Sequence, residues 1–106
     1  MIRAHFDTNH DVIAGFELSG HADSGEYGHD IVCAAVSALA ITTVNGLEQV
    51  AGLQPAITHN ETDGGYLSVS LTEPQQANVA GQTLLQSFEN GISAITDQYS
   101  DFVTIE

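Results

Sequence analysis

Residues 30–52 of the chain, DIVCAAVSALAITTVNGLEQVAG, decide the fold. Between positions 31 and 51 there is no proline and only one glycine, which is typical of a helix. Asp30 is a favoured N-cap residue, and Gly52 is well placed to end the helix. Apolar residues fall on nearly every face of this helix, as they do in helices enclosed by the rest of a protein. We therefore predict a helix over 31–51 that is deeply buried.

Two segments with alternating apolar residues precede this helix and predict a β-hairpin with one buried face. They flank the turn-like sequence Thr8-Asn9-His10-Asp11. The alternating apolar residues are Ile2, Ala4 and Phe6 before the turn and Val12, Ala14, Phe16 and Leu18 after it. The stretch 20–28 follows with three glycines and no periodicity, which predicts a loop.

A second hairpin, a second helix and a last strand are predicted after position 52. Segments 55–60 and 66–71 bracket a turn at Asp63-Gly64-Gly65. Pro74 suits the first turn of a helix whose apolar residues recur on one face: Leu84, Phe88, Ile92, Ile95 and Tyr99. Residues 102–105 form a closing strand. The order β-β-α-β-β-α-β predicts an α+β fold, a two-layer sandwich of a mostly antiparallel sheet and two helices, in a single domain over 1–106.

The charge of the chain excludes two classes of partner. Fourteen acidic residues stand against a single basic one, Arg3, which gives a net charge of −13 at pH 7. Nucleic-acid binding depends on lysine and arginine, and an anionic membrane surface would be repelled, so we expect neither partner. The same negative field favours a basic partner.

The cysteine count and the N-terminal sequence indicate the cellular setting. Cys33 is the only cysteine, so no internal disulfide can form, and a reducing cytoplasm fits best. The first residues, MIRAHFD, lack a basic segment followed by an apolar one, and no stretch approaches the length needed to cross a bilayer. We therefore expect a soluble cytoplasmic protein.

The segment that carries chemistry runs from Gly20 to Leu39, because it places a thiol at a helix start behind a loop that contains histidine. With Asp30 as N-cap, Cys33 is expected to be the third helical residue, where the helix dipole lowers the thiol pKa from its ordinary value of about 8.5. His21 lies twelve residues earlier, and the loop can bring its imidazole to the sulfur. A Cys–His pair is the minimal activated thiol nucleophile, and the amides at the helix start could stabilise an oxyanion.

Each of these residues also has a simpler interpretation. A cysteine in an apolar helix is most often a packing residue. His21 could be a solvated or structural histidine, and Asp30 could be only a helix cap. His29 could belong to the site, but nothing in its spacing requires it. The remaining histidines are most simply solvent-facing: His5, His10 and His59.

No metal and no cofactor are predicted. His21, Asp23 and His29 lie in one loop, but they match no ligand spacing with a clear mechanism. The glycines at 20, 25 and 28 form neither a dinucleotide-binding nor a phosphate-binding pattern, and no lysine follows them.

Two linked segments resemble the signature of a known family. They are Gly20-His21-Ala22 and Gly28-His29-Asp30-Ile31-Val32-Cys33-Ala34-Ala35-Val36-Ser37. A histidine, an eleven-residue gap and a cysteine inside DIVCAAVS are similar to the signature of the bacterial ribosomal-processing cysteine protease family, Prp. The predicted order of strands and helices also fits that family over essentially the whole chain.

The resemblance implies a cysteine endopeptidase with a Cys-His dyad. It would remove the basic N-terminal extension of a large-subunit ribosomal protein, the twenty-seventh in the usual naming, by cutting after aromatic residues, and so support ribosome assembly. By position, Cys33 would be the nucleophile and His21 the general base, with Asp30 and Ser37 as supporting polar residues. Members of the family look like homodimers, so a homodimer is expected here as well.

The resemblance further implies a mobile loop between the histidine and the cysteine that closes over substrate. Its residues would include Gly20, Gly25, Tyr27 and Gly28, whose glycines give the backbone its freedom. The near absence of lysine and arginine is the chief departure from the family pattern. Candidates for the walls of the aromatic pockets are Tyr27, Phe16 and Tyr66.

Two other functions compete with the protease. The first is a non-catalytic acidic adaptor that binds basic ribosomal proteins, with Cys33 in the core and the loop as a docking surface. The second is a thiol redox switch, although this chain has no second cysteine to resolve an oxidised thiol. Peptide cleavage separates the protease from both.

Overall fold

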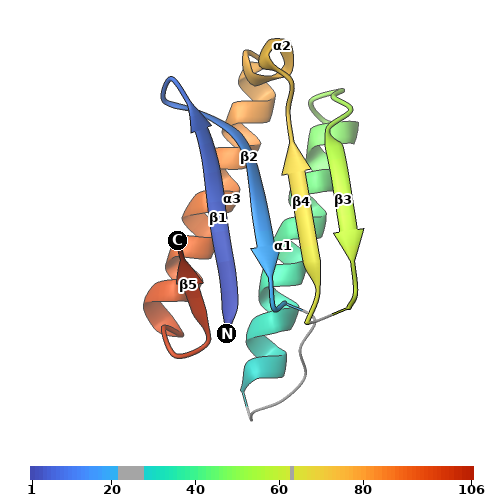
Figure 1. Ribbon diagram of the computed structural model, residues 1–106. Helices are drawn as coiled ribbons and strands as arrows, with labels where there is room; N and C mark the ends of the chain where they lie inside the picture. The colour runs from blue at the N-terminus through green and yellow to red at the C-terminus, as the bar shows by residue number, and fades with distance from the viewer. Residues whose placement is uncertain (22–27, 63) are drawn as a thin grey trace.

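The computed structural model describes residues 1–21, 28–62 and 64–106, which form a five-stranded sheet with helices packed on one of its faces (Figure 1). The sheet order is β3-β4-β2-β1-β5, and every neighbouring pair is antiparallel except β1 and β5. The predicted α+β class and mostly antiparallel sheet are therefore confirmed. The elements are β1 (Ile2–Asn9), β2 (Val12–Ser19), α1 (His29–Gln49), β3 (Ala56–Asn60), β4 (Tyr66–Ser70), α2 (Glu73–Gln76), α3 (Val79–Gln98) and β5 (Val103–Ile105).

The first hairpin closes through a two-residue turn at His10 and Asp11. Both have left-handed backbone conformations, with φ of +51° and +69°. Two left-handed residues give the turn the twist that matches paired strands, and aspartate tolerates that conformation better than most residues. The turn pairs Asn9 with Val12, and a register shift between Asp7 and Thr8 then pairs His5 with Glu17 and Phe6 with Phe16.

The core lies between the sheet and the helices, because alternation along β1 and β2 sends one set of side chains toward α1 and α3. Phe16 is fully buried there, with its ring centroid 4.4 Å from Phe88 and 6.3 Å from Phe6. The expectation that Phe16 lines an aromatic pocket is therefore wrong. Its side chain belongs to the packed interior.

The prediction that the first helix is deeply buried is wrong. Only one face of α1 is buried, while on its outer side Ile31 remains 70% exposed and Ile41 60% exposed. The helix lies on one face of the sheet with α3 beside it, so a two-layer fold leaves its outer side uncovered (Figure 1). An apolar composition on all faces indicates burial, but it does not show which faces the same chain covers.

By length and composition alone, α1 could also cross a membrane. It has 21 residues and a mean hydropathy of 1.6, so the expectation that no stretch reaches that length is wrong for this helix. In the structure its buried face packs on the sheet, as a core helix of a folded domain does. It is the one helix of this kind in the part of the chain that the structure describes.

The predicted second helix is divided into α2 and α3. Thr72 caps α2 through a capping box with Gln75, and Asn78 then begins α3 by accepting a hydrogen bond from the Gly81 amide at 2.8 Å. A second cap in the chain interrupts the helix that Pro74 begins.

Candidate functional site

The helix that carries Cys33 begins at His29, two residues earlier than predicted. Its N-cap is Gly28, whose φ of +92° is left-handed, and the first helical hydrogen bond runs from the Val32 amide to the Gly28 carbonyl at 3.3 Å. Asp30 is therefore not the N-cap. Its exposed carboxylate lies in the first turn and makes no capping bond, although its charge there favours the helix dipole.

Cys33 is consequently the fifth helical residue and not the third. In that position helical geometry directs its own amide to the His29 carbonyl, so this amide is not an oxyanion donor. The amides of Asp30 and Ile31 precede the first helical hydrogen bond. They are the donors that the start of α1 can offer to a developing negative charge.

The structure brings the Cys33 thiol into contact with His29. The thiol is 7% exposed, and Sγ lies 3.3 Å from Nδ1 and 3.7 Å from Nε2 of that imidazole. Positions four apart on a helix lie on the same face, which explains the contact. Sequence reasoning left His29 undecided because it placed the helix start after this residue. A predicted helix start at position 29 would have placed His29 and Cys33 on the same helix face.

The ring of His29 is fixed by the C-terminal segment of the chain. The residue is 6% exposed, and its ring meets the ring of Phe102 edge-on at a centroid distance of 5.9 Å. Phe102 lies between α3 and β5, and its amide bonds to the Tyr99 carbonyl at 2.9 Å. The thiol environment therefore depends on residues from both ends of the domain.

His21 lies just after β2, and the residue before it, Gly20, brings the main chain close to the Cys33 thiol. The carbonyl of Gly20, which is bonded to the His21 nitrogen, lies 4.0 Å from Cys33 Sγ. Gly20 itself has a left-handed φ of +78°, and its amide bonds to the Gly65 carbonyl at 3.1 Å. A side chain at Gly20 would overlap the carbonyl oxygen of Met1, so the close approach requires glycine.

The imidazole of His21 has the electrostatics of a proton acceptor. Burial lowers its pKa below the ordinary 6.5, the Glu61 carboxylate partly opposes this shift, and His59 adds a smaller lowering. The ring is therefore neutral near pH 7. Its Nδ1 atom is buried and has no hydrogen-bond partner among the described residues. A buried nitrogen without a partner costs free energy unless a substrate or another group engages it.

A cavity of about 370 Å³ extends from His21 along α1 toward β3 and β4. Ser37, one helical turn beyond Cys33, lines it together with His21. The other lining residues are apolar side chains with a few polar ones at one side: Ala40, Ile41, Val44, Asn45, Ile57, His59, Glu61 and Leu67. The cavity thus joins two of the predicted site residues and offers an apolar surface next to them.

Three further predictions concern the loop and the pocket walls. Tyr66, a candidate for a wall of the aromatic pockets, donates its hydroxyl to Glu17 at 2.6 Å and lines a hollow other than the cavity of His21. Gly25 and Tyr27 lie outside the described residues, as does Asp23 of the rejected metal set. The predicted mobility of the loop stays a prediction.

Comparison with known proteins identifies the family. A family model described as "Cysteine protease Prp" matches residues 1–104. The chain belongs to the Prp family of cysteine proteases. A curated relative, the ribosomal processing cysteine protease Prp of Bacillus subtilis (strain 168), is 35% identical over 104 residues, which cover 95% of this chain and 92% of the relative. The enzyme class predicted from the sequence is confirmed, and the adaptor alternative is not retained.

Solved structures share the whole fold. SMU.848 from Streptococcus mutans superposes with a TM-score of 0.95 at 39% identity, covering 100% of this chain and 92% of that one. Prp from S. aureus in complex with a substrate peptide gives 0.88 at 28% identity, and its complex with a covalently linked product peptide gives 0.84 at 29%. Each S. aureus comparison covers 100% of this chain and 98% of the other.

Proposed function

We propose that this member of the Prp family removes the N-terminal extension of the twenty-seventh large-subunit ribosomal protein by cutting after aromatic residues. Cys33 is the nucleophile and His21 the general base in this proposal, and the processed protein then enters ribosome assembly in the cytoplasm. The observation that carries it is the Cys33 thiol in the second turn of α1, in contact with the His29 imidazole and one helical turn from Ser37, which lines the cavity with His21. The names of the B. subtilis and S. aureus relatives support the substrate class.

The chemistry follows from the thiol and the neutral imidazole. Cys33 Sγ attacks the scissile carbonyl carbon while its proton passes to His21, and the amides at the start of α1 stabilise the oxyanion. When the C–N bond breaks, His21 returns the proton to the leaving amine of the ribosomal protein. Water then hydrolyses the thioester between Cys33 and the extension. The S. aureus complex with a covalently linked product supports a covalent intermediate.

The two imidazoles have different roles in this proposal. His29 holds the thiol, as the 3.3 Å contact between Sγ and Nδ1 indicates. His21 carries a buried Nδ1 that has no partner among the described residues and shares the cavity with Ser37, which supports its role as the base that meets thiol and substrate. Asp30 in the first turn of α1 and Ser37 one turn beyond Cys33 act as supporting polar residues.

The cavity supports recognition of an aromatic side chain. Its volume of about 370 Å³ and its aliphatic walls, including Ile41, Ile57 and Leu67, suit a ring. Glu61 at the same cavity places a carboxylate where a basic peptide would pass. Both features agree with a basic extension that carries aromatic residues before the cut.

The direct test is incubation with the extended ribosomal protein, followed by intact-mass spectrometry. A matched substrate in which alanine replaces the aromatic residues before the cut serves as control. We expect one cut after the aromatic residues in the first substrate and none in the second. Absence of cleavage at equimolar enzyme, or equal cleavage of both substrates, would reject the proposal. Oxidation of Cys33 without cleavage would favour the redox switch.

The rate of cleavage is expected to fall as salt is added. A net charge of −13 attracts a basic substrate, and dissolved ions screen that attraction. Between about 20 mM and 500 mM salt we expect kcat/KM to fall by roughly tenfold, measured from initial rates. An uncharged peptide with the same cut site should lose much less. A flat response with the ribosomal protein would exclude electrostatic steering.

We also propose that two copies of the chain associate through the outer side of α1. Ile31 and Ile41 are exposed there, and an apolar patch of this kind is typical of an interface. Sedimentation equilibrium is expected to show a dimer that Ile31→Asp weakens by about tenfold or more. Val79→Asp adds the same charge at an exposed apolar residue of α3 and is the matched control. A wild-type monomer at all concentrations would contradict this proposal.

A further inference from the structure

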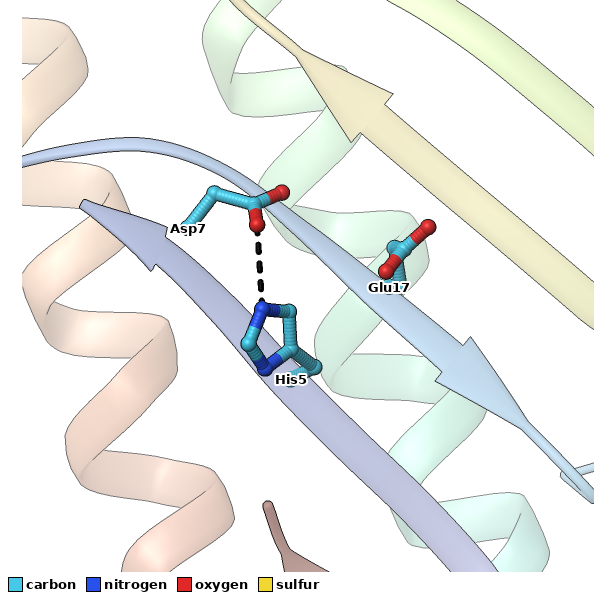
Figure 2. A group of neighbouring side chains, drawn as sticks. All are labelled: His5, Asp7 and Glu17. Atoms are coloured by element: carbon cyan, nitrogen blue, oxygen red, sulfur yellow. Dashed lines mark hydrogen bonds and ion pairs between the residues drawn. The ribbon is translucent and has the colours of Figure 1, made fainter. Parts of the chain in front are cut away.

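A second group of titratable side chains lies on the face of the sheet opposite the helices. His5 and Asp7 are two positions apart on β1, so they project from the same face, and Glu17 on β2 pairs directly with His5. Figure 2 shows the three side chains converging above the two strands. One ligand atom from each lies within 4.8 Å of the others.

The hydrogen bonding of His5 leaves one ring nitrogen directed at this group. Nδ1 lies 3.0 Å from the main-chain carbonyl oxygen of Glu106, which can only accept, so Nδ1 carries a proton. Nε2 lies 3.0 Å from Asp7 Oδ1, and a carboxylate also only accepts. With Nδ1 as the donor to Glu106, Nε2 and Oδ1 can share either a proton, as in an ordinary ion pair, or a metal ion. Metal-binding histidines commonly donate their other ring N–H to a carbonyl in this way.

Tyr66 orients the carboxylate of Glu17, the third candidate ligand, and a neighbouring hollow has room for a fourth ligand. The Tyr66 hydroxyl donates to Glu17 Oε1 at 2.6 Å, which orients that carboxylate. A hollow of about 140 Å³ adjoins the group and is lined by His5, Glu17 and Tyr66 among others. Its volume accommodates water molecules that complete a coordination shell. The overall charge of −13 further raises the local concentration of cations.

We propose that His5, Asp7 and Glu17 bind a zinc ion. One imidazole nitrogen with two carboxylates is a donor set that zinc accepts, whereas magnesium and calcium prefer oxygen ligands alone. In tetrahedral zinc sites neighbouring ligand atoms lie about 3.3 Å apart, close to the 3.0 Å between His5 Nε2 and Asp7 Oδ1. Glu17, whose Oε1 accepts from Tyr66, supplies the third ligand within 4.8 Å of the other two.

The position of the zinc site makes it structural. It lies on the face of the sheet away from α1 and Cys33, and it links β1, β2 and, through the His5 ring, the C-terminal residue Glu106. His5 was expected to be solvent-facing and no metal was predicted, because twelve positions separate His5 from Glu17 in the sequence. Only the register of the hairpin brings them together.

The test is calorimetric titration of zinc chloride into the full chain carrying Cys33→Ala, which removes the thiol as a competing ligand. We expect one site with a Kd below about 100 μM. His5→Gln and Glu17→Gln should each weaken binding by about tenfold to a hundredfold. His59→Gln is the matched control, because His59 also lies against a carboxylate, Glu61, at 2.8 Å on the surface. Its zinc affinity should equal that of the parent.

Nitrogen-15 NMR of the histidine rings gives a second readout that does not depend on the heat signal. Zinc should shift His5 Nε2 while Nδ1 keeps its proton, and it should raise the Tm of the parent but not of His5→Gln. Absence of zinc binding up to about 1 mM would overturn the proposal. So would binding that survives His5→Gln, or binding that disappears in His59→Gln.

Discussion

Cys33→Ala is expected to lower kcat/KM for the extended ribosomal protein by about ten-thousandfold or more, because no other group of the chain replaces the attacking sulfur. The variant should remain folded. Cys33 is buried in α1, and loss of one sulfur atom from the core is a small change in volume. Initial rates measured by mass spectrometry, with circular dichroism of the same samples, separate loss of chemistry from loss of structure.

Thr43→Ala is the matched control for this variant. Thr43 is as buried as Cys33, on the same helix, and its hydroxyl donates to the Leu39 carbonyl at 2.8 Å. The Thr43→Ala substitution therefore disturbs α1 to a similar extent without changing a residue of the site. We expect it to keep activity within about threefold of the wild type. If Cys33→Ala retained a tenth of the wild-type activity, the thiol could not be the nucleophile.

His21→Gln is expected to lower kcat/KM by about a hundredfold to ten-thousandfold, which is the usual contribution of a general base. His29→Gln is the matched comparison, because glutamine can still hydrogen-bond to the sulfur and should cost about tenfold or less. The pair of variants decides which imidazole moves the proton. If His29→Gln proved the more damaging change, the imidazole in contact with the thiol would be the base.

The pH dependence of wild-type kcat/KM tests the same assignment of His21 as the general base. A base must be neutral to accept a proton, and burial lowers the pKa of His21, so the acid limb of kcat/KM should lie below pH 6.5. The same lowered pKa determines how the stability of the fold changes with pH. Below pH 6.5 the unfolded chain binds a proton at His21 more readily than the folded chain, so this residue lowers stability as pH falls. His21→Gln should remove that contribution to acid unfolding.

Local patterns were sufficient to predict most of the strands and helices. The alternation of apolar residues such as Ile2, Ala4 and Phe6 indicates which side of a strand is buried. Each of the two hairpins joins strands that are adjacent in the sequence. The parallel pairing of β5 with β1 could not be predicted in the same way, because it joins the two ends of the chain. No local sequence pattern predicts that contact.

The errors near the site have a common origin in the start of α1. Asp30 and Gly28 are both plausible caps, and the sequence favoured aspartate, whereas the chain uses the left-handed conformation open to glycine. Moving the start by two residues changed the helical position of Cys33. It also brought His29 to the sulfur. His21 was proposed from its place twelve residues before Cys33 and from the family signature, but the cavity beside it is formed with β3 and β4 and required the fold.

The most direct test of the account is the rate of alkylation of Cys33 by iodoacetamide in the folded protein as a function of pH. A thiol activated by a neighbouring imidazole reacts as the thiolate, so we predict that alkylation continues well below pH 8.5 and that His21→Gln and His29→Gln together abolish this reaction. A rate that rises in a single step near pH 8.5 and is the same in the double variant would contradict the account. Alkylation that occurs only after unfolding would contradict it as well.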